Sequence, residues 1–204
     1  MQKVAAQRDE GHRALYWWTL LSLGIQPWQL VFCDETSKRE SALRRKRGWG
    51  LRGARVTRKE VFHSTKSISV LALYGISGFI DFDCVEGGYS SDDFIEAFQF
   101  MIIPHLQPGM DLVLDNCGIH HAFEDEMKAM AAAVGARILF LAPYSSIDNP
   151  IELAFNVFKI YWIRNSSYFS QLEMKDAVRE CLFNCYPNPH EAALASYRHC
   201  GYNA

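Results

Sequence analysis

The order of secondary structure along the chain restricts its fold more than any other feature. Apolar runs of strand length come first, and stretches with helical periodicity separate the later ones. Strands are predicted at 29–33, 67–74, 79–84, 111–114 and 137–141, with a weaker one at 55–62. Helices are predicted at 8–23, 92–103, 123–134, from 149 onward and at 172–185. Antiparallel strands followed by strand–helix alternation predict an α/β protein with a mixed sheet covered by helices.

The helix starts and the length agree with this arrangement. Ser90 and Ser91 are suitable N-caps for the second helix, and Asn149 is expected to cap a helix that has Pro150 near its first position. The 204 residues contain no repeats or low-complexity linker, so residues 1–204 are predicted to form a single domain. The pattern is typical of a ribonuclease-H-like mixed β-sheet flanked by helices.

Positive charge is concentrated in one segment. Ten of the 21 Lys and Arg residues lie between Lys38 and Lys59, where only Glu40 opposes them, so this segment carries +9 in a chain with net charge −2. A basic segment with three glycines predicts a loop or hairpin that contacts a polyanion. A solvated basic loop and a nuclear-localisation signal are the alternatives.

Cysteine spacing and hydropathy restrict the class of protein. The six cysteines include no CxxC pair, and Cys181 and Cys185 have no second ligand pair nearby, so no zinc motif is predicted. The polar first residues exclude a secretory signal, and the apolar stretch at 14–25 is too short to span a bilayer. We expect a protein that is neither secreted nor bound to a membrane. It would act in the nucleus of a eukaryote, or otherwise in the cytoplasm.

Three acidic residues lie where strands are predicted to end or a helix to begin. Asp34 ends QLVFCDE, Asp115 ends DLVLDN, and Glu152 follows PYSSIDNP. If the strands are neighbours, these carboxylates converge, and converging carboxylates are what a pair of divalent cations at a phosphate requires. Glu35 should point to the opposite face of its strand and is not counted as a ligand. Asp148 is a weaker candidate for a contact.

The stretches VFCDET, LVLDNCGIHH and FLAPYSSIDNPIE resemble the three signature blocks of mariner-like transposases of the DDE superfamily. The resemblance covers nearly the whole chain, including RKRGWGLRGARV and the closing RHCGY. It implies a metal-dependent DNA endonuclease and strand transferase with Asp34, Asp115 and Glu152 as catalytic and metal-binding residues. It further implies Mg²⁺ or Mn²⁺ as cofactor, with two ions expected.

The resemblance also implies supporting residues and partners. Asn116 is expected near the metal, and His120 is expected to contact a phosphate or orient a carboxylate; local capping of the next helix is the alternative for both. Double-stranded DNA, as transposon ends and target, is the expected partner, and a homodimer is allowed. The residues expected to contact DNA are Lys38, Arg39, Arg44, Arg45, Lys46, Arg47, Arg52 and Arg55.

Other functions remain open at this point. Family members carry helix-turn-helix domains before the catalytic domain, and we expect none among the residues before Asp34. The chain could therefore be a catalytically idle DNA-binding or assembly module with the same fold. A dehalogenase-type phosphatase would need an acid where Thr36 stands. Another ribonuclease-H-like nuclease, such as a resolvase, is the third alternative.

Overall fold

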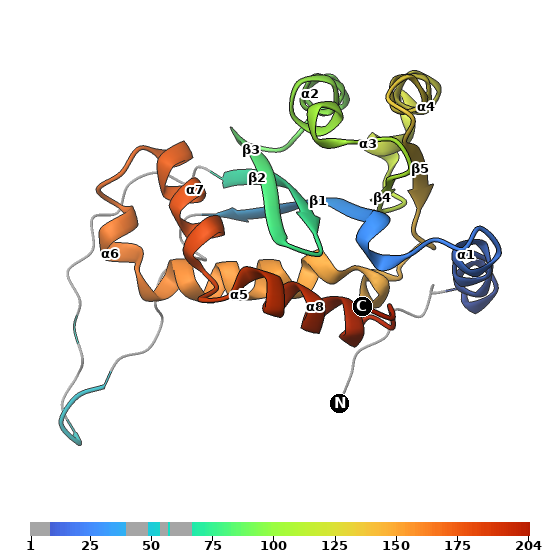
Figure 1. Ribbon diagram of the computed structural model, residues 1–204. Coiled ribbons are helices and arrows are strands. Elements are labelled where there is room, and N and C mark those ends of the chain that lie inside the picture. Colours follow the sequence, from blue (N-terminus) through green and yellow to red (C-terminus); the bar gives the residue numbers. More distant parts are fainter. Residues whose placement is uncertain (1–8, 40–48, 54–56, 58–66) are drawn as a thin grey trace.

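The sheet forms the centre of the molecule. The computed structural model describes residues 9–39, 49–53, 57 and 67–204. Five strands form one mixed sheet in the order β3-β2-β1-β4-β5 (Figure 1). β1–β2 and β2–β3 are antiparallel, whereas β1–β4 and β4–β5 are parallel. The strands are β1 (Leu30–Arg39), β2 (Ser67–Gly75), β3 (Gly78–Glu86), β4 (Asp111–Leu114) and β5 (Arg137–Phe140).

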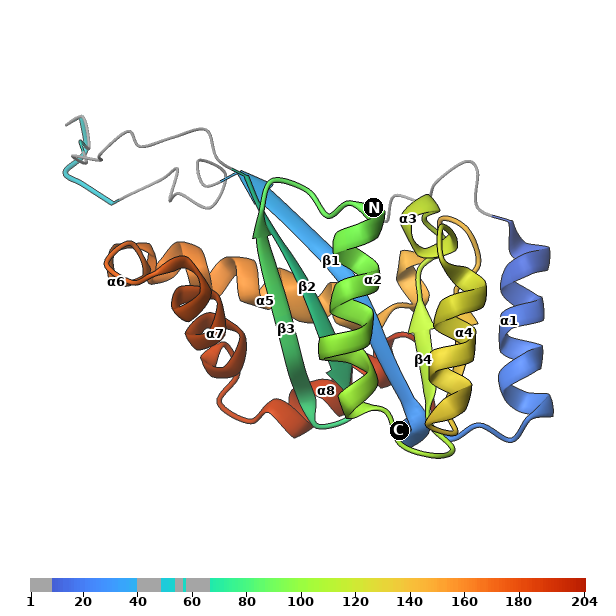
Figure 2. The same cartoon turned by 90° about the horizontal axis from the view of Figure 1, so that it is seen from above.

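Helices cover both faces of this sheet. One face carries α2, α3 and α4, and the other carries α5 and α8, as Figures 1 and 2 show. The α2 helix continues as a π-helical turn (Phe98–Ile102) and a 3₁₀ turn (Ile103–His105). The helices are α1 (Glu10–Ser22), α2 (Ser91–Ala97), α3 (Gly118–His121), α4 (Glu124–Ala133), α5 (Pro150–Arg164), α6 (Ser166–Phe169), α7 (Met174–Asn184) and α8 (Pro189–His199). Single 3₁₀ turns lie at Pro27–Gln29 and Ser146–Asp148.

Alternate residues of β1 enter two separate hydrophobic cores. Leu30 and Phe32 belong to the core with α5, α7 and α8, whereas Val31 and Cys33 belong to the core with α2 and α4. This follows from the two-residue period of a strand that is buried on both faces. The same alternation places Asp34 on the α5 face and Glu35 on the face of α2, α3 and α4.

The register of β1 and β4 brings two acidic residues together. Cys33 pairs with Leu114 in the parallel ladder, so the next residues along the two strands are Asp34 and Asp115. β1 continues to Arg39 against β2 after β4 has ended. Beyond the end of β4, the edge of β1 that faced β4 is unpaired, so side chains from both faces of β1 can reach the space next to it.

Most predicted elements are confirmed. The hairpin of β2 and β3 is present, and its Gly78 adopts φ 107°, where an added Cβ would lie 2.9 Å from Pro189 Cβ. β1 is longer than the predicted strand at 29–33, so Asp34 lies inside the strand and not at its end. The helix α8 was not predicted, and the weak strand at 55–62 lies almost entirely outside the described residues. None of the described helices has the length and apolar character needed to cross a membrane.

Candidate metal and nucleic-acid site

The three predicted acids line one cavity. Asp34 comes from β1, Asp115 directly follows β4, and Glu152 lies in the first turn of α5. The cavity has a volume of about 660 Å³ and is otherwise lined by Glu35, the turn at 116–117, the loop at 141–146 and Asn149. The sequence prediction that these three carboxylates come together is therefore supported by their positions in the fold.

Asp34 is buried and lacks a cationic partner among the described residues. It is 7% exposed, and Asn149 Nδ2 donates a hydrogen bond to its Oδ2 at 2.9 Å. Burial, together with the negative charges of Asp115 and Glu152, raises the pKa of Asp34 to about 8. Within the described part of the chain, no cationic side chain therefore offsets a negative charge on Asp34.

Asp115 has the opposite surroundings. His120 is fully buried, and its Nδ1 lies 2.7 Å from Asp115 Oδ1 while its Nε2 lies 3.1 Å from Glu35 Oε1. Burial opposes protonation of His120, but the hydrogen bonds to the two carboxylates outweigh it and raise the pKa of His120 to about 11. Burial likewise opposes ionisation of Asp115, but the interaction with His120 lowers the pKa of this carboxyl below its usual range. Phe94 packs against the imidazole with ring centroids 4.4 Å apart.

For Glu35, the sequence predicted the direction of the side chain but not its position at the cavity. It does face away from Asp34, as predicted, and contacts His120 on the other side of the sheet. It nevertheless lines the same cavity, because β1 runs past the end of β4 and both of its faces reach the opening. His120 was expected either to contact a phosphate or to orient a carboxylate, and its contacts with Asp115 and Glu35 agree with the second role.

Asn149 differs from its prediction. Its side chain makes no capping hydrogen bond to α5 and binds Asp34 instead. Its Oδ1 is buried, and no hydrogen-bond partner for it is found within the described part of the chain. Asn116 lies at the cavity, where its Oδ1 accepts a hydrogen bond from His121 Nε2 at 2.7 Å.

Asp148 has a structural role that the sequence did not indicate. Arg13 of α1 donates to both of its carboxylate oxygens, at 2.6 and 2.8 Å, and Asp148 is 1% exposed. The Tyr202 hydroxyl donates to the Asp148 carbonyl at 2.7 Å and lies 2.9 Å from the Tyr16 hydroxyl. These contacts fix the turn before Glu152 to both ends of the described chain. Asp148 itself does not line the cavity.

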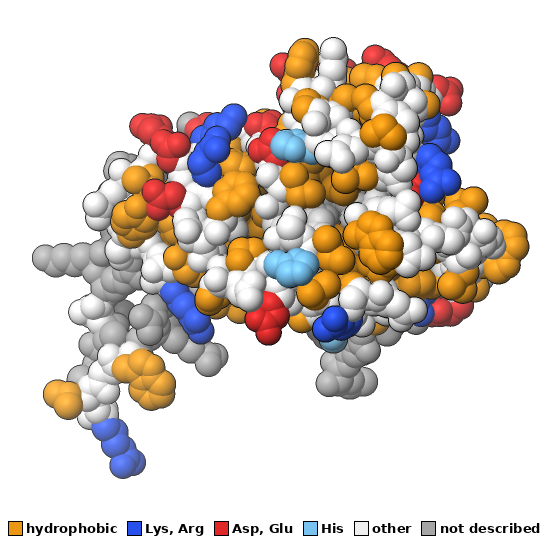
Figure 3. Space-filling model, in the orientation of Figure 1, with side chains coloured by type: hydrophobic (Ala, Val, Ile, Leu, Met, Phe, Trp, Pro, Cys, Tyr) orange, Lys and Arg blue, Asp and Glu red, His pale blue; other side chains and the backbone are white. Residues whose placement is uncertain are grey.

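The residues predicted to contact DNA lie only partly in the described chain. Lys38 and Arg39 end β1, and Arg52 lies in a turn at 52–53. On the face drawn in Figure 3, the described Lys and Arg side chains are dispersed and form no continuous patch. The predictions for Arg44, Arg45, Lys46, Arg47 and Arg55 concern positions outside the described residues.

The donor set fits a hard divalent cation. Asp34, Asp115 and Glu152 supply carboxylate oxygens, which Mg²⁺ and Mn²⁺ prefer. Burial, and then repulsion by Asp115 and Glu152, raises the pKa of Asp34 and disfavours its ionised form, and a bound cation would oppose both effects. The buried Asn149 Oδ1 without a partner adds a further polar oxygen beside Asp34.

Comparisons with known proteins agree with this geometry. Residues 29–175 match the DDE superfamily endonuclease family. The fold matches the Mos1 strand transfer complex at 15% identity and TM-score 0.59, over 98% of this chain and 62% of that chain. It also matches a Mos1 transposase catalytic domain solved with raltegravir and Mg, at 10% identity and TM-score 0.51, over 100% of both chains.

A more distant match extends the fold comparison to an integrase assembly. A chain of the simian T-cell lymphotropic virus intasome, in complex with a PP2A regulatory subunit, matches at 16% identity and TM-score 0.50, over 79% of this chain and 49% of that chain. No curated protein matches the chain. The likeness to transposase and integrase catalytic domains confirms the predicted ribonuclease-H-like fold. The chain spans less than two thirds of the length of the Mos1 chain in the strand transfer complex.

Proposed function

This chain belongs to the DDE superfamily of endonucleases, and we propose that it cuts DNA and joins the cut end to a target as the catalytic domain of a cut-and-paste transposase. The observation that carries the proposal is the convergence of Asp34, Asp115 and Glu152 on one cavity from three separate elements. The family match covers all three residues.

The carboxylates of Asp34, Asp115 and Glu152 are the groups that would hold Mg²⁺ or Mn²⁺, and we expect two ions. When bound, the ions would stabilise the charge that develops on the phosphate during an in-line displacement. Asn149 holds the Asp34 carboxylate through its amide, and His120 holds that of Asp115 through Nδ1. Such neighbours fix the direction of ligand oxygens, which is a condition for placing a phosphate accurately.

DNA binding would come from the basic segment between Lys38 and Lys59. This segment begins at the end of β1, the strand that carries Asp34, so it continues directly from the strand that supplies the first acid of the proposed site. Contacts from Lys and Arg to phosphates are independent of sequence and weaken steeply as salt increases. Transposon ends and target DNA are the proposed duplexes, and a second copy of the chain is the proposed assembly partner.

The test is nicking of supercoiled plasmid by the purified chain in Mg²⁺ or Mn²⁺. We expect metal-dependent nicking that EDTA abolishes and that Asp115→Asn reduces to background. Asp83→Asn is the matched control, since Asp83 is a half-buried strand carboxylate that does not line the cavity. Equal nicking by the wild type and Asp115→Asn would overturn the proposal. DNA binding without any nicking by the wild type would favour the alternative of an idle DNA-binding module.

A further inference from the structure

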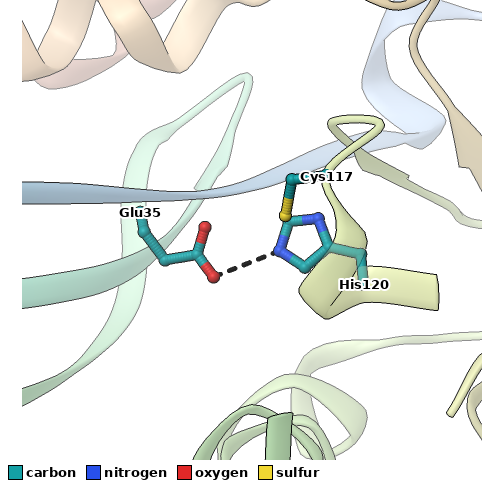
Figure 4. Close-up of side chains that lie close together, drawn as sticks. All are labelled: Glu35, Cys117 and His120. Atoms are coloured by element: carbon teal, nitrogen blue, oxygen red, sulfur yellow. Dashed lines mark hydrogen bonds and ion pairs between the residues drawn. The ribbon is translucent and has the colours of Figure 1, made fainter. Parts of the chain in front are cut away.

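A nitrogen, a sulfur and an oxygen donor meet on the Glu35 side of the cavity. His120 Nε2, Cys117 Sγ and a Glu35 carboxylate oxygen all lie within 4.8 Å of one another. Figure 4 shows the Glu35 carboxylate reaching from β1 toward the imidazole, with the Cys117 side chain directed to the same ring. His120 is fully buried, and the Glu35 side chain is 19% exposed.

The separation of the Glu35 and His120 donors is close to that of two ligands on one ion. Zn²⁺ binds sulfur at about 2.3 Å and nitrogen or oxygen at about 2.0–2.2 Å, so tetrahedral ligand atoms lie roughly 3.5 Å apart. His120 Nε2 and Glu35 Oε1 are 3.1 Å apart. The Glu35–His120 pair is therefore already near the spacing of metal ligands, and Cys117 Sγ lies within 4.8 Å of both ligand atoms.

The outer contacts also suit a metal-binding histidine. The other ring nitrogen, Nδ1, lies 2.7 Å from Asp115 Oδ1 and 3.2 Å from the Asp115 carbonyl. A histidine that binds a metal through one nitrogen commonly donates a hydrogen bond from the other to a carboxylate, which fixes its tautomer and orientation. The ligands come from β1 and from the turn and short helix after β4, so the sheet fixes their relative positions.

We propose that Glu35, Cys117 and His120 bind one soft divalent cation of the Zn²⁺ class, with a fourth position open to water or to an oxygen in the cavity. The thiolate and imidazole distinguish this site from the oxygen-only set of Asp34, Asp115 and Glu152, because sulfur ligands favour Zn²⁺ over Mg²⁺ or Mn²⁺. Glu35 and Cys117 line the same cavity as the three acids. The bound cation therefore lies next to the site of the proposed DNA chemistry.

Binding is accompanied by the loss of two protons. The cation takes the Nε2 lone pair, so the proton that Nε2 donates to Glu35 leaves for solvent, and the Cys117 thiol loses its proton on becoming a thiolate. Nδ1 keeps its proton and its hydrogen bond to Asp115. Glu35 exchanges a hydrogen bond for a bond to the metal.

Co²⁺ is the probe that separates this site from the carboxylate site. A Co²⁺–thiolate bond gives a charge-transfer band in the near ultraviolet, which carboxylate ligands do not produce. We expect one equivalent of Co²⁺ to give this band with the reduced, full chain, and Zn²⁺ to displace it. Cys117→Ser should remove the band and weaken Zn²⁺ binding by at least about tenfold. Cys84→Ser is the matched control and should retain both, since Cys84 is a half-buried free cysteine of β3.

A second measurement protects the test against a folding defect. Zn²⁺ should raise the unfolding midpoint of the wild type and of Cys84→Ser, because it binds the folded chain more tightly than the unfolded chain, and the rise should be smaller in Cys117→Ser, where only the carboxylate site remains. Glu35→Gln should weaken Zn²⁺ binding while keeping the thiolate band. The proposal is overturned if the wild type gives no band, or if Cys117→Ser keeps it. Both outcomes are independent of Mg²⁺-dependent nicking, so this site and the proposed enzymatic function can fail separately.

Discussion

Asp34 and Glu35 follow each other on β1 yet lie in opposite electrostatic surroundings. Asp34 faces Asp115, Glu152 and a neutral amide, and its pKa is raised to about 8. Glu35 faces His120, which is positively charged because its pKa is raised to about 11 and which also pairs with Asp115. Among the described residues, the Asp34 side of the strand therefore has no cation, whereas the Glu35 side has the imidazolium of His120. The difference indicates that Asp34 needs an external ion to carry its negative charge, whereas Glu35 has the His120 imidazolium as its partner when no metal is bound.

The largest difference should be in the nicking rates of two single variants, one that removes the Asp34 carboxylate and one that removes the Glu35 carboxylate. Asp34→Asn should lower metal-dependent nicking by more than about a hundredfold, since it removes a proposed metal ligand. Glu35→Gln should lower it by about tenfold or less, because its effect reaches Asp115 only through His120. Initial nicking rates in Mg²⁺ measure both. A loss for Glu35→Gln as large as that for Asp34→Asn would break the distinction between the two sides.

The second effect concerns His120, the protonated side chain that pairs with Glu35 and Asp115. His120→Gln should destabilise the chain by about 1.5–3 kcal/mol, because two carboxylates lose the charged donor supplied by a fully buried imidazole, although the Asp115 side chain is 41% exposed. His105→Gln is the matched control: His105 pairs with Asp81 at 2.8 Å, but both side chains are more than a third exposed. Its cost should be below about 1 kcal/mol. Urea unfolding at pH 7 in EDTA gives both values, and equal costs would show that burial of the His120 pair contributes nothing.

The third effect is the pH dependence that Asp34 confers on the metal-free chain. Because burial raises its folded pKa to about 8, well above the ordinary value of an aspartate, its contribution to stability is complete below about pH 4 and is lost as pH rises through 8. We expect about 2–3 kcal/mol, since neighbouring carboxylates share the titration. Urea unfolding of the wild type and Asp34→Asn at pH 5 and 8.5 in EDTA isolates this contribution. The free energy of unfolding of the wild type, relative to that of Asp34→Asn, should be lower at pH 8.5 than at pH 5, and Mg²⁺ should reduce this change.

The smallest effect should come from the amide beside Asp34. Asn149→Ala removes the hydrogen bond to Asp34 Oδ2 and should cost about 1–2 kcal/mol in the metal-free chain. Asn184→Ala removes an exposed bond to the Glu180 carbonyl and should change stability by less than about 0.5 kcal/mol. Urea unfolding midpoints of the two variants and of the wild type give both stability changes. Similar small changes in both would mean that Asn149 does not hold Asp34.

The sequence predicted the positions of the acids better than their surroundings. Strand periodicity and the βα order were sufficient to bring Asp34, Asp115 and Glu152 to one edge of the sheet. The extension of β1 beyond Asp34 depends on pairing with β2, which lies far along the sequence, and local periodicity does not reveal such pairing. Asn149 and Asp34, which are in contact, lie 115 positions apart in sequence, and the local sequence favoured a helix cap for Asn149 instead. Cys117 and His120 are three positions apart, a spacing that a search for paired cysteines does not detect.

The central claim is that Asp34, Asp115 and Glu152 form one site for divalent cations, and Mn²⁺ affinity tests it most directly. Calorimetric titration of the metal-free chain should show saturable Mn²⁺ binding that is at least about tenfold weaker in Glu152→Gln. Asp83→Asn, which changes a carboxylate outside the cavity, should bind as the wild type does. The same Mn²⁺ affinity in the wild type and Glu152→Gln, with both chains folded, would contradict the claim.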